Sequence, residues 1–411
     1  MKHFGLLGRK LGHSFSPQIH QLLSDYDYRL YEKEPDEVED FVKRGQLDGF
    51  NVTIPYKETV IPFCDVLSET AQKIGSVNTI VYRGGKIEGH NTDYAGFAYL
   101  LKKTGVHPAG KKAIVLGSGG SSKTASAVLR DMGAKSVTVI SRTGENNYQN
   151  LNLHADAQLI INTTPVGMYP NCGAAPISLA DFPACEGVVD IIYNPAKTRL
   201  LLDARERQIP FVNGLPMLVA QAKKAAEIFL DRPIDDGVIP EIVRKIESQT
   251  KNIAIIGMPG CGKTSVGKAL AKKLGRTFVE TDDLIPQRAG KSIPDLFRED
   301  GEEAFRKIET EVLSDCAKQS GVVLATGGGV VTRPENLPLL RQNSVIVFLR
   351  RELQALPLDG RPLSQKYGVQ QLAKERLPLY RAWCDWEIES TGVIEETAER
   401  IAKTVFSEER T

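Results

Sequence analysis

Short apolar runs alternate with longer stretches of mixed polarity along most of the chain. The runs are four to six residues long and cover residues 4–7, 50–54, 77–81, 113–116, 136–140, 159–162, 188–192, 253–256, 322–325 and 344–349. Runs of this length predict buried strands, and the amphipathic stretches between them predict helices. The alternation therefore indicates an α/β fold in which helices cover parallel sheets.

A glycine-rich loop follows the fourth of these runs. Its sequence is Gly117-Ser-Gly-Gly-Ser-Ser122, and an amphipathic stretch comes directly after it. Such a loop between a strand and a helix is typical of a Rossmann domain, in which a dinucleotide pyrophosphate lies on the helix N-terminus. Ser122 stands where the usual pattern has a third glycine, so helix and strand should approach slightly less closely.

The strand predicted at residues 136–140 ends in Ser141-Arg142-Thr143. An NAD site usually places an acidic residue here, where it binds the ribose 2′-hydroxyl. An arginine instead suits the 2′-phosphate of NADP. The alternative is that Arg142 is simply a solvated residue after a strand.

A second glycine-rich loop of a different kind follows the run at 253–256. Its sequence, Gly257-Met-Pro-Gly-Cys-Gly-Lys-Thr264, fits the P-loop pattern G-x-x-x-x-G-K-[ST]. Lys263 should contact the β and γ phosphates of a nucleoside triphosphate, and Thr264 should hold Mg²⁺. The loop alone does not choose between a kinase, an ATPase and a GTPase.

Composition narrows the class of partner. The 411 residues include 52 Lys plus Arg against 51 Asp plus Glu, a net charge of +1, which recommends neither nucleic acid nor an anionic membrane. No apolar run approaches the roughly 20 residues that span a bilayer, and the N-terminus lacks the pattern of a signal peptide. We expect a cytoplasmic protein that binds small molecules. The six scattered cysteines argue against a disulfide framework and a zinc site.

Seven further motifs accompany the first loop in the N-terminal half: Gly12-His-Ser-Phe-Ser-Pro17, Asn51-Val-Thr-Ile-Pro-Tyr-Lys57, Ser76-Val-Asn-Thr79, Gly89-His-Asn-Thr-Asp93, Ile161-Asn-Thr-Thr-Pro-Val-Gly-Met168, Asp190-Ile-Ile-Tyr-Asn-Pro195 and Gly214-Leu-Pro-Met-Leu-Val-Ala-Gln221. In this order they resemble the shikimate dehydrogenase family over residues 1–247. The resemblance implies a substrate α/β domain (1–95 plus 214–247) and an inserted NADP-binding Rossmann domain (96–213).

The resemblance also implies roles for individual residues. Lys57 would donate a proton to the substrate carbonyl, and Asp93 would orient Lys57 and bind a hydroxyl. Substrate contacts are expected from Ser14, Ser16, Thr53, Asn78, Tyr193 and Gln221. NADP contacts are expected from Gly117, Ser118, Gly119, Gly120, Ser121, Ser141, Arg142, Thr143, Asn162 and Gly214. The structural alternatives are that Ser16 and Asp93 cap helices and that Lys57 is solvated.

Motifs after the P-loop resemble the shikimate kinase family over residues 250–405: Thr281-Asp-Asp283, Gly301-Glu-Glu-Ala-Phe-Arg-Lys-Ile-Glu309, Thr326-Gly-Gly-Gly329, Gly360-Arg-Pro-Leu363 and Glu375-Arg-Leu-Pro-Leu-Tyr380. This implies a P-loop domain of the NMP-kinase type at 251–411. ATP contacts are expected from Gly257, Gly260, Cys261, Gly262, Lys263, Thr264, Ser265 and Arg361. Shikimate contacts are expected from Asp282, Arg306, Gly327, Gly328, Gly329 and Arg376.

Asp282 is also the expected proton acceptor of the kinase reaction, and Lys263 its expected catalytic cation. The alternatives are that Arg306 forms a helix-surface pair with Glu302 or Glu309, and that Asp282 caps a helix.

Two features depart from the kinase pattern. Glu280 stands where the family usually has an aspartate that helps, with Thr264, to organise Mg²⁺, and the segment 350–360 is shorter than a usual lid. The interpretation is a bifunctional enzyme that reduces 3-dehydroshikimate with NADPH and phosphorylates shikimate with ATP and Mg²⁺. The alternatives are a dehydrogenase with an ATP-sensing domain, and a scaffold without chemistry. The sequence leaves open whether the chain forms a homo-oligomer.

Overall fold

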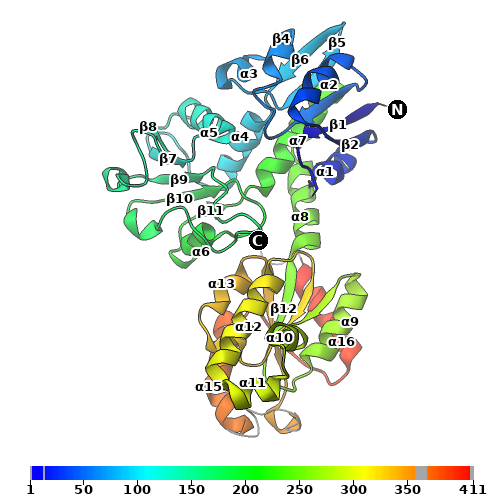
Figure 1. Cartoon of the computed structure of the whole chain (residues 1–411), viewed down its shortest axis with the longest axis vertical. Coiled ribbons are helices and arrows are strands. Elements are labelled where there is room, and N and C mark those ends of the chain that lie inside the picture. Colours follow the sequence, from blue (N-terminus) through cyan, green and yellow to red (C-terminus); the bar gives the residue numbers. More distant parts are fainter. Residues whose placement is uncertain (1, 13, 357–367, 408–411) are drawn as a thin grey trace. The chain divides into compact units, whose positions relative to one another are not determined.

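The computed structural model describes residues 2–12, 14–356 and 368–407, which form two compact units (Figure 1). The first unit comprises residues 1–167, 174–193 and 203–245. The second comprises residues 168–173, 194–202 and 246–411. All ten apolar runs coincide with strands, so the predicted α/β class is confirmed.

The first unit begins with a mixed six-stranded sheet in the order β2-β1-β3-β5-β6-β4. Its strands are β1 (His3–Gly8), β2 (Asp27–Glu32), β3 (Gly49–Val52), β4 (Val66–Leu67), β5 (Thr79–Arg83) and β6 (Lys86–His90). β1 lies parallel to β2 and β3, whereas β5 runs antiparallel to both β3 and β6. Parallel and antiparallel pairing are therefore combined in this sheet.

The second sheet of this unit is wholly parallel, in the order β11-β10-β9-β7-β8. Its strands are β7 (Lys112–Leu116), β8 (Ser136–Ile140), β9 (Leu159–Asn162), β10 (Gly187–Asp190) and β11 (Phe211–Val212). The run at residues 113–116 is buried in β7, between β9 and β8, and the first glycine loop follows its carboxyl end. In open α/β sheets that edge is where ligands bind.

The helices and 3₁₀ turns before β12 are α1 (Ser16–Leu23), η1 (Pro35–Glu37), α2 (Val38–Arg44), η2 (Ile61–Phe63), α3 (Glu69–Ile74), α4 (Asp93–Lys103), α5 (Gly120–Asp131), η3 (Leu151–His154), η4 (Leu179–Asp181), α6 (Arg199–Glu206), α7 (Leu215–Leu230) and α8 (Val238–Thr250). α7 returns to the first sheet, where Phe229 stacks on Phe4 with ring centroids 4.3 Å apart. α8 ends at Thr250 and β12 begins at Asn252, so only Lys251 separates this helix from the next strand.

A glycine sets the distance between α4 and α7. A Cβ on Gly96 would lie only 2.8 Å from the Met217 carbonyl oxygen and 2.9 Å from Gln221 Cβ. A side chain at this position would force the helices apart, because real Cβ contacts are not this short. The close approach brings Gln221 of α7 to the start of α4, where Thr92 Oγ1 lies 3.3 Å from Gln221 Oε1.

The second unit holds a wholly parallel sheet in the order β13-β14-β12-β15-β16. Its strands are β12 (Asn252–Ile256), β13 (Phe278–Glu280), β14 (Val323–Ala325), β15 (Ser344–Arg350) and β16 (Trp386–Glu389). The helices and 3₁₀ turns are α9 (Lys263–Leu274), α10 (Thr281–Ala289), α11 (Ile293–Glu299), α12 (Gly301–Ala317), η5 (Val330–Thr332), α13 (Asn336–Arg341), η6 (Leu353–Ala355), α15 (Val369–Trp383) and α16 (Ile394–Phe406). Within the described ranges, no helix is both long and apolar enough to cross a membrane.

Candidate active sites

The first unit contains a cavity of about 530 Å³ that gathers residues from both of its sheets. Lys57 and Asp93 line it together with all six expected substrate contacts: Ser14, Ser16, Thr53, Asn78, Tyr193 and Gln221. Ser121 and Gly214, two of the expected NADP contacts, border the same cavity. Residues that lie up to 207 positions apart in the sequence, from Ser14 to Gln221, therefore meet at one place.

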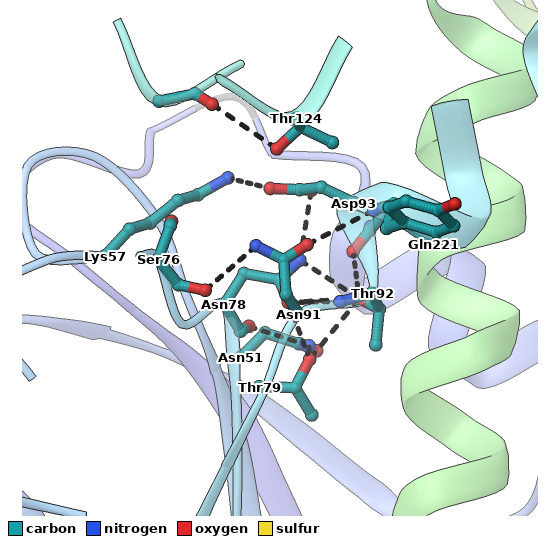
Figure 2. Close-up of polar contacts among 12 residues, drawn as sticks. Asn51, Lys57, Ser76, Asn78, Thr79, Asn91, Thr92, Asp93, Thr124 and Gln221 are labelled. Atoms are coloured by element: carbon teal, nitrogen blue, oxygen red, sulfur yellow. Dashed lines mark hydrogen bonds and ion pairs between the residues drawn. The ribbon is translucent and has the colours of Figure 1, made fainter. Parts of the chain in front are cut away.

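Lys57 and Asp93 form an ion pair in this cavity (Figure 2). Lys57 Nζ donates to Asp93 Oδ2 at 2.6 Å, and the side chains are 22% and 12% exposed. Asn78 Nδ2 donates to the other oxygen, Asp93 Oδ1, at 3.0 Å. Asp93 is the first residue of α4 and Thr92 is its N-cap, so Asp93 is not the cap itself. Its carboxylate is free to orient the lysine ammonium toward the cavity.

A buried chain of hydrogen bonds supports this pair from behind. Tyr28 OH donates to Asn51 Oδ1 at 2.7 Å, and Asn51 Nδ2 donates to Thr79 Oγ1 at 2.9 Å and to the Asn78 carbonyl at 3.3 Å. Thr92 N donates to Asn78 Oδ1 at 2.7 Å, which fixes the orientation of the Asn78 amide. Asn51 and Thr92 were not predicted as site residues, although both stand inside the quoted motifs.

His20 closes the buried end of this chain. Its ring stacks on Tyr28 at 3.9 Å between centroids, and its Nδ1 lies 2.6 Å from Tyr26 OH. His20 is 1% exposed, and burial lowers the pKa of its imidazole to about 3, with Asn51 opposing the shift. The histidine is therefore neutral in the folded protein at ordinary pH. α1 begins at Ser16, but its N-cap is Phe15, so Ser16 does not cap the helix; it is one of the residues that line the cavity.

Buried His20 should make the first unit less stable in mild acid. The pKa is lowered in the folded state, so the unfolded state binds the extra proton, and stability is lost as pH falls below about 6.5. We expect a loss of about 1 kcal/mol between about pH 7 and about pH 5.5. Hydrogen exchange of the amides in α1 and β2, corrected for the intrinsic pH dependence, measures it. His20→Phe should remove this dependence of stability on pH, whereas His107→Asn, at an exposed histidine, should leave it unchanged. The same pH dependence in His20→Phe and in the wild type would contradict the assignment to His20.

The dinucleotide loop lies between β7 and α5 as predicted. Gly117 has φ +104, and a Cβ there would lie 2.9 Å from Thr163 Oγ1, so both backbone and packing require glycine. Gly119 is the N-cap of α5, with no heavy atom within 4 Å of a Cβ built on it. Ser122 is buried in the first turn of α5, where it replaces the third glycine. The open face at Ser118 and Gly119 leaves the helix N-terminus accessible to an anion.

The remaining expected NADP residues fall into two groups. Arg142 and Thr143 are exposed after β8, and Ser141 Oγ accepts from Gly144 N at 2.8 Å, which shapes that turn. Asn162 is fully buried; its Nδ2 donates to Asp190 Oδ1 at 3.0 Å, and its Oδ1 accepts from Thr164. Asn162 thus holds the loop after β9, and its contact with NADP stays a prediction.

Arg142 should decide which dinucleotide is used. Arg142→Ala removes the expected partner of the 2′-phosphate, so KM for NADPH should rise about ten- to hundred-fold, the range for a charge-assisted hydrogen bond. NADH lacks this phosphate, and its kinetics should not change. Steady-state rates with both dinucleotides measure the difference, with Arg130→Ala, on the exposed side of α5, as the control. An equal effect on NADH and NADPH would contradict the role.

The second unit contains a cavity of about 640 Å³ at the carboxyl ends of its strands. It is lined by P-loop residues and by each described residue expected to contact shikimate: Gly260, Gly262, Lys263, Thr264, Ser265, Asp282, Arg306, Gly327, Gly328, Gly329 and Arg376. Glu280, Glu309 and Arg351 line it as well. Arg361 lies outside the described residues. Glu309 and Arg351 were not among the residues expected at this site.

The P-loop wraps around its own lysine. Lys263 is 8% exposed, and its Nζ donates to the carbonyls of Gly257 and Met258 at 2.9 and 3.1 Å. Gly257, Gly260 and Gly262 all have positive φ, as required for a loop that turns its amides inward. Cys261 is only 1% exposed and is absent from the cavity lining, so only its backbone could reach a phosphate.

Each glycine of the triple-glycine turn makes room for a different group. A Cβ on Gly327 would collide with Glu309 Oε1 and lie 2.9 Å from Asp282 Oδ1. A Cβ on Gly329 would collide with the guanidinium group of Arg306. Gly328 supplies a carbonyl that accepts from Arg376 Nη1 at 3.1 Å and from Tyr380 OH. The turn therefore brings two carboxylates and two guanidinium groups against one stretch of backbone.

Arg306 forms ion pairs with both Glu302 and Glu309, the two partners expected if it were only a helix-surface residue. Its Nη1 donates to Glu309 Oε2 at 2.6 Å and its Nη2 to Glu302 Oε1 at 3.3 Å. The Arg306 and Glu309 side chains are only 5% and 1% exposed, so this is a cavity pair rather than a surface pair. Such a buried arginine is held in a defined direction and can receive a carboxylate in bidentate geometry.

Three carboxyl groups in this cavity are poorly solvated. Burial raises the pKa of Asp282, with Lys263 and Arg306 opposing the shift, and burial likewise raises the pKa of Glu309. Asp282 Oδ1 and Glu309 Oε1 have no hydrogen-bond partner among the described residues. Glu280 is the N-cap of α10 but makes no side-chain cap bond. Burial raises the pKa of Glu280, and a hydrogen bond from the Thr264 hydroxyl partly opposes this.

Two family models match the chain. Residues 259–406 match the model described as "Shikimate kinase", and residues 6–80 match the "Shikimate dehydrogenase substrate binding domain". The kinase match includes most of the second cavity, from Gly260 to Arg376.

Two curated relatives are similar to the N-terminal part of the chain. "Shikimate dehydrogenase (NADP(+))" of Clostridium perfringens (strain 13 / Type A) is 37% identical over 268 residues, which is 60% of this chain and 99% of that protein. The protein of the same description from Methanopyrus kandleri is 36% identical over 272 residues, which is 58% of this chain and 93% of its own length.

Solved structures are similar to the same part of the chain. A chorismate mutase/shikimate 5-dehydrogenase fusion protein from Clostridium acetobutylicum superimposes with a TM-score of 0.58 and 37% identity, over 60% of this chain and 97% of that one. Shikimate 5-dehydrogenase from Thermus thermophilus, in complex with NADP(H) and shikimate, gives a TM-score of 0.55 and 30% identity, over 60% of this chain and 99% of that one.

Proposed function

The chain belongs to the shikimate dehydrogenase family over its N-terminal 60% and carries a shikimate kinase domain at residues 259–406, and from this we propose that one chain catalyses two consecutive steps. 3-Dehydroshikimate is reduced to shikimate with NADPH, and shikimate is phosphorylated to shikimate 3-phosphate with ATP. The observation that carries the proposal is that each cavity contains a proton-transfer residue beside the groups its own reaction needs.

In the dehydrogenase site, Lys57 holds the proton that the reaction consumes. When bound at the loop after β7, NADPH would supply a hydride to the carbonyl carbon of the substrate, and negative charge would develop on the carbonyl oxygen. Lys57 Nζ donates a proton to that oxygen, which gives the hydroxyl of shikimate. Asp93, 2.6 Å from Nζ, orients the ammonium group. Ser14 and Ser16 offer hydroxyl donors to the substrate carboxylate across the cavity.

In the kinase site, Asp282 accepts the proton of the attacking hydroxyl as the γ-phosphoryl group is transferred from ATP. Arg306 and Arg376 bind the substrate carboxylate, and the Gly327–Gly329 backbone lies against the ring. Lys263 offsets charge on the phosphates during transfer. A buried, unpaired Asp282 oxygen suits a base that is satisfied only when a hydroxyl arrives.

Thr264 and Glu280 would hold Mg²⁺ in this site. The two side chains are already within hydrogen-bond reach, and Glu280 Oε2 is buried without a partner among the described residues, so an oxygen-liganded cation fits. When bound, the ion would offset negative charge on the phosphates. Although Glu280 replaces the usual aspartate, its carboxylate still lies beside the hydroxyl of Thr264.

Two assays on the same purified protein test the proposal. NADPH oxidation should depend on 3-dehydroshikimate, and ADP release should depend on shikimate. ATP that alters the dehydrogenase rate but is never consumed with shikimate would support the ATP-sensing alternative instead. Asp282, Arg306 and Arg376 argue against that alternative, because an ATP sensor needs no carboxylate pocket.

A further inference from the structure

Two ion pairs connect both ends of α5 to the part of the first unit that carries the catalytic pair. In the first turn of α5, Lys123 Nζ donates to Glu58 Oε1 at 2.7 Å. At the last residue of α5, both oxygens of Asp131 accept from Lys73 Nζ on α3 at 2.5 Å. The pairs lie eight positions apart, about 12 Å along a helix. Together the two pairs fix both the direction of α5 and its distance from the elements that carry Glu58 and Lys73.

Two of the three partners of α5 are sequence neighbours of the catalytic residues. Glu58 directly follows Lys57. Tyr94 directly follows Asp93, and its hydroxyl donates to Asp131 Oδ2 at 2.7 Å. Ser121, in the first turn of α5, lines the cavity that holds Lys57 and Asp93. The helix that starts at the dinucleotide loop is therefore tied to both members of the catalytic pair.

The charges on α5 do not serve the helix itself. A cation near a helix N-terminus and an anion at its C-terminus are both disfavoured by the helix dipole. Lys123 and Asp131 occupy these two unfavourable ends. The charge of Lys123 is instead balanced by Glu58, in the turn after β3, and the charge of Asp131 by Lys73 on α3. This placement is expected if Lys123 and Asp131 serve to hold α5 against the elements that carry Glu58 and Lys73.

We propose that the Glu58–Lys123 pair and the Lys73–Asp131–Tyr94 cluster are positioning contacts that hold the dinucleotide loop at a set distance and angle from Lys57 and Asp93. Hydride transfer requires donor and acceptor carbons in near-attack geometry, and small displacements of either side lower its rate. The inference rests on the proposed dehydrogenase reaction. Neither Glu58 nor Lys123 lines the cavity, so their effect is transmitted through backbone position.

A charge-swap cycle tests the Glu58–Lys123 pair in the full-length protein. The proteins are the wild type, Glu58→Lys, Lys123→Glu and the double swap. Glu39→Lys is the control, because the Lys43–Glu39 pair lies within α2 at 2.5 Å and is similarly exposed. The readouts are kcat for 3-dehydroshikimate reduction and the primary isotope effect with NADPH deuterated at the transferred position. Each single swap should lower kcat about two- to five-fold and raise the isotope effect, as expected for one exposed ion pair.

The double swap should restore both values, and about 1 M salt should reduce the differences, since exposed charges are screened. Equal kcat and equal isotope effects in all proteins would overturn the positioning role and leave the proposed reaction standing. A double swap whose kcat is as low as that of the single swaps would also overturn the positioning role. In that case Glu58→Lys would act on the adjacent Lys57 directly, and a change at position 123 could not restore the rate. Absence of turnover in the wild type would overturn the reaction and the role together.

Discussion

Lys57→Ala is expected to lower kcat for 3-dehydroshikimate reduction by about two to four orders of magnitude, the range for loss of a positioned general acid. Lys57 Nζ is held 2.6 Å from Asp93 at the edge of the cavity, and no other lysine of the described chain is paired to Asp93. The nucleotide loop lies on a different sheet, so NADPH should still bind. The change in the fluorescence of NADPH itself on titration with the protein measures binding separately from turnover.

Two further variants separate proton donation from charge and from general damage. Lys57→Arg keeps a cation beside Asp93 but cannot release a proton at ordinary pH, so it should be nearly as slow as alanine. Lys43→Ala, on the surface of α2, should be fully active. Turnover by Lys57→Ala within a few-fold of wild type would remove Lys57 from the mechanism.

Asp282→Asn is expected to abolish the kinase reaction, with a loss of about two to four orders of magnitude, and to leave the dehydrogenase unchanged. The same change should raise the stability of the second unit. Burial raises the pKa of Asp282 in the folded state, so its contribution to stability is present at low pH and is lost as pH rises through that pKa. A neutral amide avoids this loss at neutral pH.

The chain allows the second effect to be measured in place. Its two tryptophans, Trp383 and Trp386, both lie in the second unit, so tryptophan fluorescence during thermal unfolding reports on that unit. Asp283→Asn is the matched control, because Asp283 is the exposed neighbour on the same turn and does not line the cavity. A kinase rate retained in Asp282→Asn, or a lowered unfolding midpoint, would contradict the assignment of a buried catalytic base.

The strands that hydropathy failed to predict lie at sheet edges or carry polar residues. β2 is an edge strand whose sequence, Asp-Tyr-Arg-Leu-Tyr-Glu, is largely solvated. β6, with the sequence Lys-Ile-Glu-Gly-His, buries little apolar surface. A different signal was available for β6: Gly84 and Gly85, both with positive φ, form the two-residue hairpin loop from β5.

The candidate sites were predicted better than the contacts that support them. Motif residues such as Lys57, Asp93 and Gln221 are named by their patterns and do line one cavity. Their supports depend on pairings that no local pattern contains. The bond from Tyr28 to Asn51 joins β2 to β3. The contact of Glu309 with the Gly327 turn requires the packing of α12 to be known.

The most direct test of the account is a single incubation of the purified protein with 3-dehydroshikimate, NADPH, ATP and Mg²⁺, followed by mass spectrometry of the products. The expected product is shikimate 3-phosphate, with one NADPH oxidised and one ATP consumed for each molecule formed. The same incubation with Lys57→Ala should yield no phosphorylated product unless shikimate is added. Accumulation of unphosphorylated shikimate by the wild-type protein, with ATP unspent, would contradict the account.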